Sequence, residues 1–154
     1  MIHPRLRTSA VAAVVLGACS VAPLTATAGP ASAVTIELYA IGTGPIWAQG
    51  TWVASGEIED EGTYVEIARS TGHRTHFVKT LTGANGTIVI EVDLVSVATS
   101  SLARTVEYGR WNVVAGTGAY ATLKGGGCPA RHYGVAYLPV ESATVTHEGF
   151  VKLR

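Results

Sequence analysis

The sequence predicts an all-β protein, an eight-stranded antiparallel up-and-down barrel that follows an N-terminal export segment. Three observations predict this fold. After residue 33 no segment keeps a helical spacing of apolar residues, and runs of β-branched and aromatic residues recur between Gly, Asn, Asp and Ser. The 154 residues suffice for one domain with a hydrophobic core. Short strands with tight connections need a sandwich or a closed barrel to protect their edges, and the up-and-down barrel is the simpler closure.

The first 33 residues have the layout of a secretory signal peptide. Arg5 and Arg7 form a short basic start, an apolar run follows at 10–18, and small residues lead to Ala31-Ser32-Ala33. The apolar run is shorter than the roughly 20 residues that cross a bilayer, and no later run is long enough either. We therefore expect cleavage after Ala33 and a soluble, secreted domain over residues 34–154.

A second way of processing this segment is open. Leu16-Gly17-Ala18-Cys19 fits a loose lipobox, in which a lipid on Cys19 anchors the protein at the cell surface. In either case Cys19 cannot pair with Cys128. We therefore expect Cys128 to be a lone thiol, either a small buried residue or a dimer-forming or reactive one.

The charge of the predicted domain indicates no nucleic-acid partner. Removing Arg5 and Arg7 from the eleven Lys and Arg leaves nine against eleven Asp and Glu, a net charge of −2. No basic patch stands out in the sequence, as one does in most nucleic-acid-binding domains.

The eight expected strands are residues 34–41, 50–58, 62–70, 73–82, 86–98, 103–115, 119–126 and 142–153. A run near 133–138 is a candidate extension of the seventh. The turn-forming residues Glu59-Asp60-Glu61-Gly62 separate the second strand from the third. Gly83-Ala84-Asn85-Gly86 separates the fourth from the fifth, and its Asn-Gly pair readily adopts the positive φ angles of a tight hairpin. Consecutive strands are therefore expected to pair as antiparallel hairpins.

The fifth and sixth strands each show two distinct faces. In the fifth, the even residues from Ile88 to Leu94 form an apolar face, and the odd residues form a mixed, acidic one. In the sixth, the even residues from Arg104 to Arg110 share one face, and the odd residues from Thr105 to Val113 share the other. Alternation in one strand does not say which face lines the interior.

The most distinctive stretch runs from Trp111 to Gly127. Its spacing Gly116-x-Gly118-x-x-Ala121 matches a dinucleotide-binding fingerprint, which requires a strand before the glycines and a helix after them. A β-like run follows instead, so we reject nucleotide binding. We expect Gly116 and Gly118 to form a tight or bulged hairpin, Trp111 and Tyr120 to supply aromatic packing, and the glycines at 125–127 to let a strand bend at a barrel corner.

The pattern Trp-x-Val-Val-x-Gly-Thr-Gly-x-Tyr-x-x-Leu-x-Gly, from Trp111 to Gly125, resembles that of the allene oxide cyclase-like barrels. These include plant allene oxide cyclases and dirigent proteins, and small secreted actinobacterial proteins look more similar still. The resemblance covers most of residues 34–127 and departs at 125–132. It implies an eight-stranded barrel, often oligomeric, whose lumen holds an apolar or aromatic substrate and steers a cyclisation or coupling without a metal or organic cofactor. No catalytic residue of the family can be matched to a position in this chain.

Polar side chains on the predicted strands are therefore the candidate site residues. Those that share a strand face are Tyr64 with Glu66, Arg74 with His76, Glu91 with Asp93, and Arg104 with Tyr108 and Arg110. If these faces line the lumen, Arg and Tyr could orient a carbonyl or enolate-like oxygen while a carboxylate or His moves a proton. The candidate catalytic residues are Tyr64, Glu66, His76, Glu91, Arg104 and Tyr108. The alternative is that these faces point to water, as polar strand positions commonly do.

The sequence contains no complete set of metal ligands. His73 and His76 are three residues apart and would point to opposite faces of a strand, while His132 and His147 lie elsewhere without a cluster of cysteines. The chain has no Gly-x-Ser-x-Gly elbow, which leaves a Cys128–His132 pair as the nucleophile candidate. We therefore expect no metal, and the resemblance implies no organic cofactor.

Three functions remain open at this point. The first is a secreted, cofactor-free barrel that binds a small apolar or aromatic molecule in its lumen. The second is an allene oxide cyclase-like isomerase or cyclase that acts in that lumen. The third is a filled barrel with a structural or surface-interaction role, carried by loops such as 42–49 and 127–133. The resemblance adds a second copy of the chain as a candidate partner.

Overall fold

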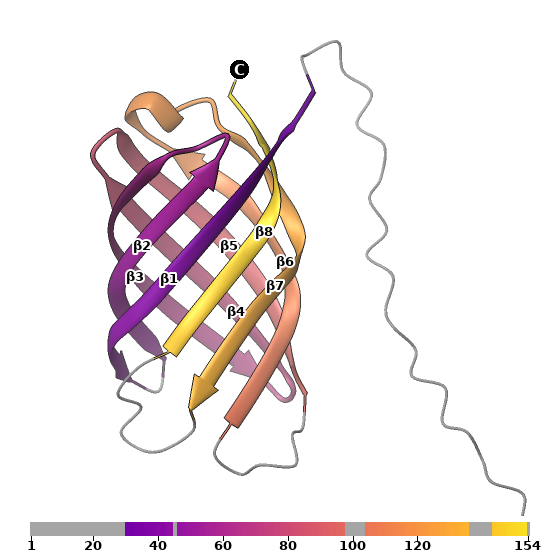
Figure 1. The fold of residues 1–154 in the computed structure, drawn as a ribbon. Helices are drawn as coiled ribbons and strands as arrows, with labels where there is room; N and C mark the ends of the chain where they lie inside the picture. Colours follow the sequence, from indigo (N-terminus) through magenta and orange to yellow (C-terminus); the bar gives the residue numbers. More distant parts are fainter. Residues whose placement is uncertain (1–29, 45, 98–103, 136–142, 154) are drawn as a thin grey trace, which may run out of the picture.

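The computed structural model describes residues 30–44, 46–97, 104–135 and 143–153. In these ranges eight strands form a closed barrel in which each strand pairs antiparallel with the next and β8 pairs with β1 (Figure 1). The strands are β1 (Ser32–Gly44), β2 (Trp47–Gly56), β3 (Asp60–Thr71), β4 (Arg74–Gly83), β5 (Gly86–Val97), β6 (Arg104–Gly116), β7 (Lys124–Val135) and β8 (Ala143–Lys152). The predicted fold class, an eight-stranded antiparallel barrel, is confirmed. No helix in the described ranges is both long and apolar enough to cross a membrane.

The seventh strand is the one whose predicted position is wrong. A strand is predicted over 119–126, but the structure has a short 3-10 helix, η1 (Gly118–Tyr120), in the first part of that range. β7 begins only at Lys124. The chain turns here because Gly118 has a φ of +58°, and because the buried ring of Tyr120 is turned into the end of the barrel. The candidate extension near 133–138 corresponds in part to the end of β7 at Val135.

The predicted domain start lies inside β1. This strand begins at Ser32, and Ser32 and Ala33 pair with Val151 and Phe150 of β8. The Ala33 carbonyl also accepts a hydrogen bond from the Glu57 N–H at 2.9 Å. Cleavage after Ala33 would therefore remove two residues of β1 and leave the rest of the strand paired.

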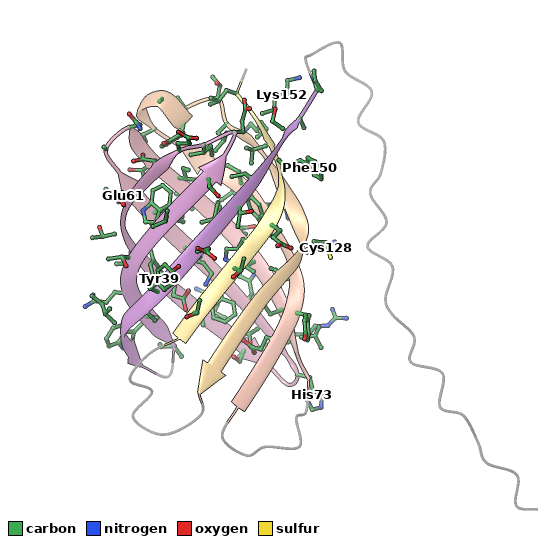
Figure 2. The ribbon with its side chains drawn as sticks, viewed as in Figure 1. Tyr39, Glu61, His73, Cys128, Phe150 and Lys152 are labelled. Atoms are coloured by element: carbon green, nitrogen blue, oxygen red, sulfur yellow. The ribbon has the colours of Figure 1, made fainter. Side chains whose placement is uncertain are left out.

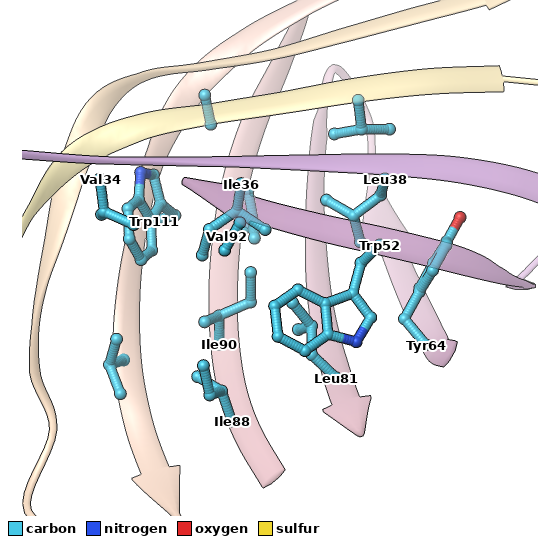
Figure 3. Close-up of a cluster of buried hydrophobic side chains, with 14 of the residues drawn as sticks. Val34, Ile36, Leu38, Trp52, Tyr64, Leu81, Ile88, Ile90, Val92 and Trp111 are labelled. Atoms are coloured by element: carbon cyan, nitrogen blue, oxygen red, sulfur yellow. The ribbon is translucent and has the colours of Figure 1, made fainter. Parts of the chain in front are cut away.

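Strand alternation places one side chain of every two inside the barrel. The apolar face of β5, from Ile88 to Leu94, is buried, and in β6 the inward face is the one that carries Trp111 and Val113. Figure 3 shows Trp111 and Trp52 on either side of the branched aliphatic side chains of Ile36 and Ile90. Burying each large apolar side chain stabilises the fold by about 1.5–3 kcal/mol.

Both buried tryptophans have a partner for their indole N–H. The Trp52 N–H donates to the Thr82 carbonyl at 3.2 Å, and the Trp111 N–H donates to the Glu148 carbonyl at 2.9 Å. Gly83 leaves the room that the Trp52 ring needs, because a Cβ at Gly83 would lie 2.9 Å from that ring. The two tryptophan rings thus fill this part of the interior, and Gly83 leaves room for one of them.

Asp60 joins three connections at one end of the barrel, which we call the latch end. Its Oδ2 accepts a hydrogen bond from the Tyr120 hydroxyl at 2.7 Å, and its two oxygens accept from the backbone N–H groups of Glu61, Ala84 and Asn85 at 2.9, 3.2 and 3.2 Å. Partial burial acts to raise the pKa of Asp60, but these hydrogen bonds outweigh it and lower the pKa. Burial, followed by the hydrogen bond to Asp60, raises the pKa of Tyr120 to about 12.

The Gly-Thr-Gly motif, residues 116–118, also lies at the latch end. The Thr117 N–H donates to the Thr87 carbonyl at 2.9 Å, and the Thr117 hydroxyl accepts from the Thr87 N–H at 3.0 Å. A Cβ at Gly116 would lie 2.1 Å from the Tyr120 carbonyl oxygen, so only glycine fits there. The expected packing of Trp111 and Tyr120 is confirmed. The expected tight hairpin at the glycines is wrong, because residues 117–123, which include η1, connect β6 to β7.

Cys128 corrects a prediction about the thiol. It lies on the outside of β7 and is exposed (Figure 2), because the register shift between Gly126 and Ala130 turns Ala130 inward and leaves Cys128 on the outer face. It is disulfide-bonded, and the described residues contain no free cysteine. The expectation of a lone, buried thiol is therefore wrong. Cys19, the other cysteine of the sequence, lies outside the described residues.

Candidate functional site

The interior of the barrel contains charged and polar side chains. Among the described residues, Glu66, Lys79, Glu107 and His147 are the buried members of this group, and Tyr64 is buried beside them. All five lie from the middle of the barrel toward the end with the β1–β2 and β3–β4 turns, which we call the far end. We take this polar lumen as the candidate site.

Glu66 and Lys79 form an ion pair at the centre of the site. They are direct cross-strand neighbours in β3 and β4, and the Lys79 ammonium donates to Glu66 Oε2. The side chains are only 7% and 1% exposed. The ammonium also lies 4.8 Å from the centre of the Phe77 ring, on whose face a cation is attracted.

Tyr64 completes this group on the neighbouring inward position of β3. Burial, and then the negative charge of Glu66, raise its pKa well above the ordinary value of a phenol. The hydroxyl therefore keeps its proton at any physiological pH. It can serve as a hydrogen-bond donor to an oxygen in the lumen.

A buried ion pair is a poor way to stabilise a core. Removing two charges from water costs several kcal/mol for each ion, and replacing such a pair by apolar residues of similar volume is often neutral or stabilising. Removing only one partner is strongly destabilising, since it leaves a buried charge uncompensated. Stability alone therefore does not explain the buried Glu66–Lys79 pair, which makes it the centre of the candidate site.

The wall around the pair carries small side chains. Ala48 is the cross-strand neighbour of Glu66 in β2, and Ala68 follows Glu66 on the inner face of β3. Ala40 and Ala130 are buried on β1 and β7. Alanines occupy little of a barrel cross-section, and a small eight-stranded barrel either fills its interior with side chains or holds one small ligand.

His147 and Glu107 add two more polar groups from β8 and β6. His147 is fully buried, with its ring centre 6.0 Å from that of Trp111. Glu107 shares the inward face of β6 with Trp111. Acidic, basic and phenolic groups thus reach the lumen from at least four strands.

The six sequence-predicted candidates do not share one compartment. Tyr64 and Glu66 lie inside and adjacent, as their shared face predicts. His76, Glu91 and Tyr108 lie on outer strand faces, so they do not join Tyr64 and Glu66 in a pocket. Arg104 belongs to β6, but its side chain is outside the described part of the structure. Whether Tyr64 and Glu66 act on a substrate stays a prediction.

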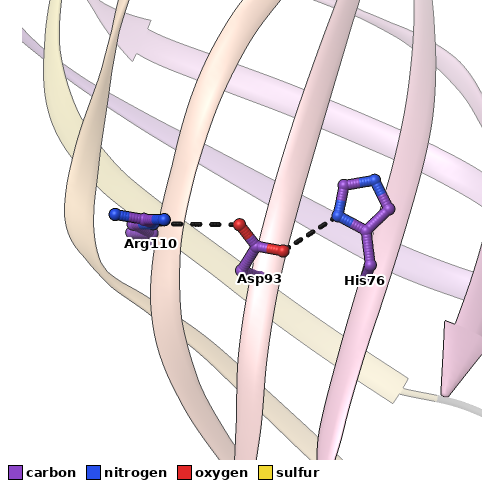
Figure 4. A network of polar contacts seen from close by, with 3 residues as sticks. All are labelled: His76, Asp93 and Arg110. Carbon is purple, nitrogen blue, oxygen red and sulfur yellow. Dashed lines mark hydrogen bonds and ion pairs between the residues drawn. The ribbon is translucent and has the colours of Figure 1, made fainter. Parts of the chain in front are cut away.

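The outer candidates form a small surface network. His76 Nδ1 lies 2.9 Å from Asp93 Oδ1, and the Arg110 Nε lies 3.8 Å from Asp93 Oδ2 (Figure 4). The side chains are 39%, 54% and 73% exposed. Exposed ion pairs of this kind contribute about 0–1 kcal/mol, so the network is part of the solvated wall.

Three residues of the lumen were missed, and the sequence did contain a signal for each. Lys79 stands between Phe77 and Leu81 in the apolar row of its strand. Glu107 shares a row with Trp111 and Val113, and His147 lies between Val145 and Val151. A charged or polar residue within an otherwise apolar row is the signal of a buried polar group.

The histidines whose side chains the structure describes do not form a cluster. His73 lies in the β3–β4 turn and His76 on the outer face of β4, whereas His147 lies inside. The side chain of His132 is outside the described part, and so is the geometry of the proposed Cys128–His132 pair. Within the described ranges, no group of three His, Cys, Asp or Glu residues could hold a metal ion.

No protein-family model, no curated protein and no solved structure matches this chain. The resemblance to allene oxide cyclase-like barrels thus remains a prediction from the motif alone.

Proposed function

We propose that this protein is a secreted, cofactor-free barrel that binds a small apolar or aromatic molecule in its lumen. The observation that carries the proposal is the buried Glu66–Lys79 pair, with Tyr64 beside it and Ala48 opposite. The proposal takes the alanines as the positions that leave space for a ligand, and the aliphatic and aromatic walls as the contacts of its apolar body. Tyr64 and the ion pair then recognise one polar atom of the ligand, such as a carbonyl or hydroxyl oxygen.

The test is a titration of the purified protein with N-phenyl-1-naphthylamine, a neutral aromatic fluorophore. We expect saturable binding with one fluorophore per chain. Ala48→Trp, which puts an indole against Glu66, should weaken binding by about tenfold or more, since it removes the space for an aromatic body. Ala115→Trp, at an exposed alanine of β6, should leave binding unchanged.

Two results would overturn luminal binding. One is the absence of saturable binding to the wild-type chain. The other is an equal effect of the two tryptophan variants, which would place the fluorophore on the surface. Ala48→Leu is the milder variant to use if Ala48→Trp does not fold, with folding followed by circular dichroism.

An isomerase or cyclase acting in the lumen is the second candidate. The observation that favours it is the adjacency of a proton-retaining phenol, Tyr64, to a carboxylate, Glu66, since such a pair can donate to one atom of a substrate and accept a proton from another. Tyr64→Phe and Glu66→Gln should then each lower turnover of a molecule that the lumen binds by about 10²–10⁴-fold. If turnover were unchanged in both folded variants, ligand binding without catalysis would be the remaining function.

Export is part of the same proposal and needs a separate test. The supporting observation is the basic, apolar and small-residue order of the first 33 residues. N-terminal sequencing of protein recovered from the medium should begin at Val34. Such processing would remove Cys19, the only other cysteine of the sequence, so Cys128, which is disulfide-bonded in the full chain, should then react with a thiol reagent. Recovery in the membrane fraction, with a lipid on Cys19, would favour the surface-anchored alternative.

A further inference from the structure

The outer wall of β2, β3 and β4 carries a block of uncharged side chains. Cross-strand pairing places them in three rows: Trp47, Ile67 and Val78; Gln49, Val65 and Thr80; and Thr51, Thr63 and Thr82. Ile67 is 62% exposed, Val65 54%, Trp47 45% and Val78 38%. We call these nine residues the neutral face. A contiguous exposed patch with a large apolar share usually marks an interaction site.

Charged residues border the neutral face with opposite sign at its two ends. Along the outer side of β3 the order is Glu61, Thr63, Val65, Ile67 and Arg69, and all five are exposed or partly so. Glu61 lies four residues before Val65, toward the latch end, and Arg69 lies four residues after it, toward the far end. Arg69 is also the cross-strand neighbour of His76. Along β3 the face therefore has an acidic border, a neutral centre and a basic border, and on its β5 side Glu91 lies beside Val78.

We propose that the neutral face binds a second copy of this chain in a two-fold symmetric dimer, with the axis passing near Val65. With that axis lying in the interface and perpendicular to β3, the second copy's β3 runs in the opposite direction, so each Glu61 meets the Arg69 of the other. The same surface then supplies both partners of two charge pairs around an apolar centre, which is the self-complementarity that a two-fold interface requires. The charge pattern favours this occupant over an unrelated protein, because it matches itself on reversal.

The experiment is sedimentation velocity on the purified full chain over a concentration series. We expect a species of twice the monomer mass that dissociates on dilution. Val65→Lys should raise the dimer dissociation constant by about tenfold or more, because it buries two ammonium groups near the axis. Val114→Lys is the matched control, since Val114 is an exposed valine on β6 outside the neutral face, and it should leave the constant unchanged. Thr63→Lys replaces Val65→Lys if the latter does not fold.

Charge reversal tests the symmetry itself. Glu61→Arg and Arg69→Glu should each weaken the dimer by about tenfold, because each brings like charges together twice. The double variant restores both pairs and should return the dissociation constant to within about threefold of the wild type. A wild-type chain that stays monomeric, a larger assembly, insensitivity to Val65→Lys, or a double variant as weak as the single ones would each overturn the proposal.

Discussion

The latch half and the far half of the barrel interior are filled in different ways. In the latch half, large rings meet glycines, the indole N–H groups donate to backbone carbonyls, and Asp60 ties Tyr120 to the β4–β5 turn. In the far half, Ala48 and Ala68 lie next to Glu66 of a buried ion pair, and Tyr64 is the neighbouring phenol. The first arrangement stabilises the closed barrel. The second contributes little to stability that apolar side chains would not provide better, and this is the basis on which we propose a ligand site there.

The largest expected effect is on the ion pair of the far half. Lys79→Met should lower the free energy of unfolding by about 3–5 kcal/mol, because it leaves the Glu66 carboxyl buried without its partner. The double variant Lys79→Met/Glu66→Leu should return to within about 1 kcal/mol of the wild type or exceed it. Urea unfolding measures both, and Lys124→Met, at an exposed lysine, is the control. A double variant as unstable as Lys79→Met would mean that the pair is structural.

The contrast between the halves was only partly predictable from the sequence. Alternation in β5 and the Asn85-Gly86 turn were enough to predict sequential hairpins and a closed barrel. The sequence alone could not place Glu66 against Lys79, because that contact depends on the register set by the β3–β4 turn. His76 and Glu91 were taken as candidates by polarity, yet polarity alone is equally typical of the solvent face. The position of β7 was missed because Tyr120 is fixed by Asp60, 60 residues away in the chain.

The second effect concerns Gly118 at the latch end, compared with Gly72 in the β3–β4 turn at the far end. Gly118 and Gly72 both have a positive φ, +58° and +62°. Alanine at either position therefore introduces a similar backbone strain, which lowers the free energy of unfolding by about 1–2 kcal/mol. A Cβ at Gly118 would also lie 2.4 Å from the Asn85 carbonyl oxygen, whereas a Cβ at Gly72 meets nothing within 4 Å. Gly118→Ala should therefore cost about 1–3 kcal/mol more than Gly72→Ala in thermal unfolding. Equal costs would show that the latch is loosely packed.

The third effect is the pH dependence of the stability that Asp60 and Tyr120 contribute at the latch end. Tyr120→Phe removes a hydrogen bond to a carboxylate and should cost about 1.5–3 kcal/mol at neutral pH. The raised pKa of Tyr120, about 12, adds stability that is complete below pH 10 and is lost as the pH rises through 12. The lowered pKa of Asp60 adds stability above its ordinary pKa, and this is lost as the pH falls through the folded-state value.

Unfolding curves of wild type and Tyr120→Phe across the pH range separate these two contributions. The variant should lose the decline between pH 10 and 12 and show a shallower decline in acid, because Asp60 keeps only its backbone donors. A difference between the two proteins that does not change with pH would mean that the hydroxyl matters for packing alone.

The smallest effect gives the most direct comparison of the two halves. Ala54 and Ala48 are both buried, inward-facing alanines of β2, one near the latch end and the other beside Glu66. Leucine at Ala54 should overpack the ring-filled half and cost about 1–3 kcal/mol, while leucine at Ala48 should cost less than about 1 kcal/mol. Chemical unfolding of the two variants measures the difference. Equal costs would mean that side chains fill the far half as completely as the latch half, and a filled barrel acting through its surface would then explain the protein better than a ligand-binding lumen.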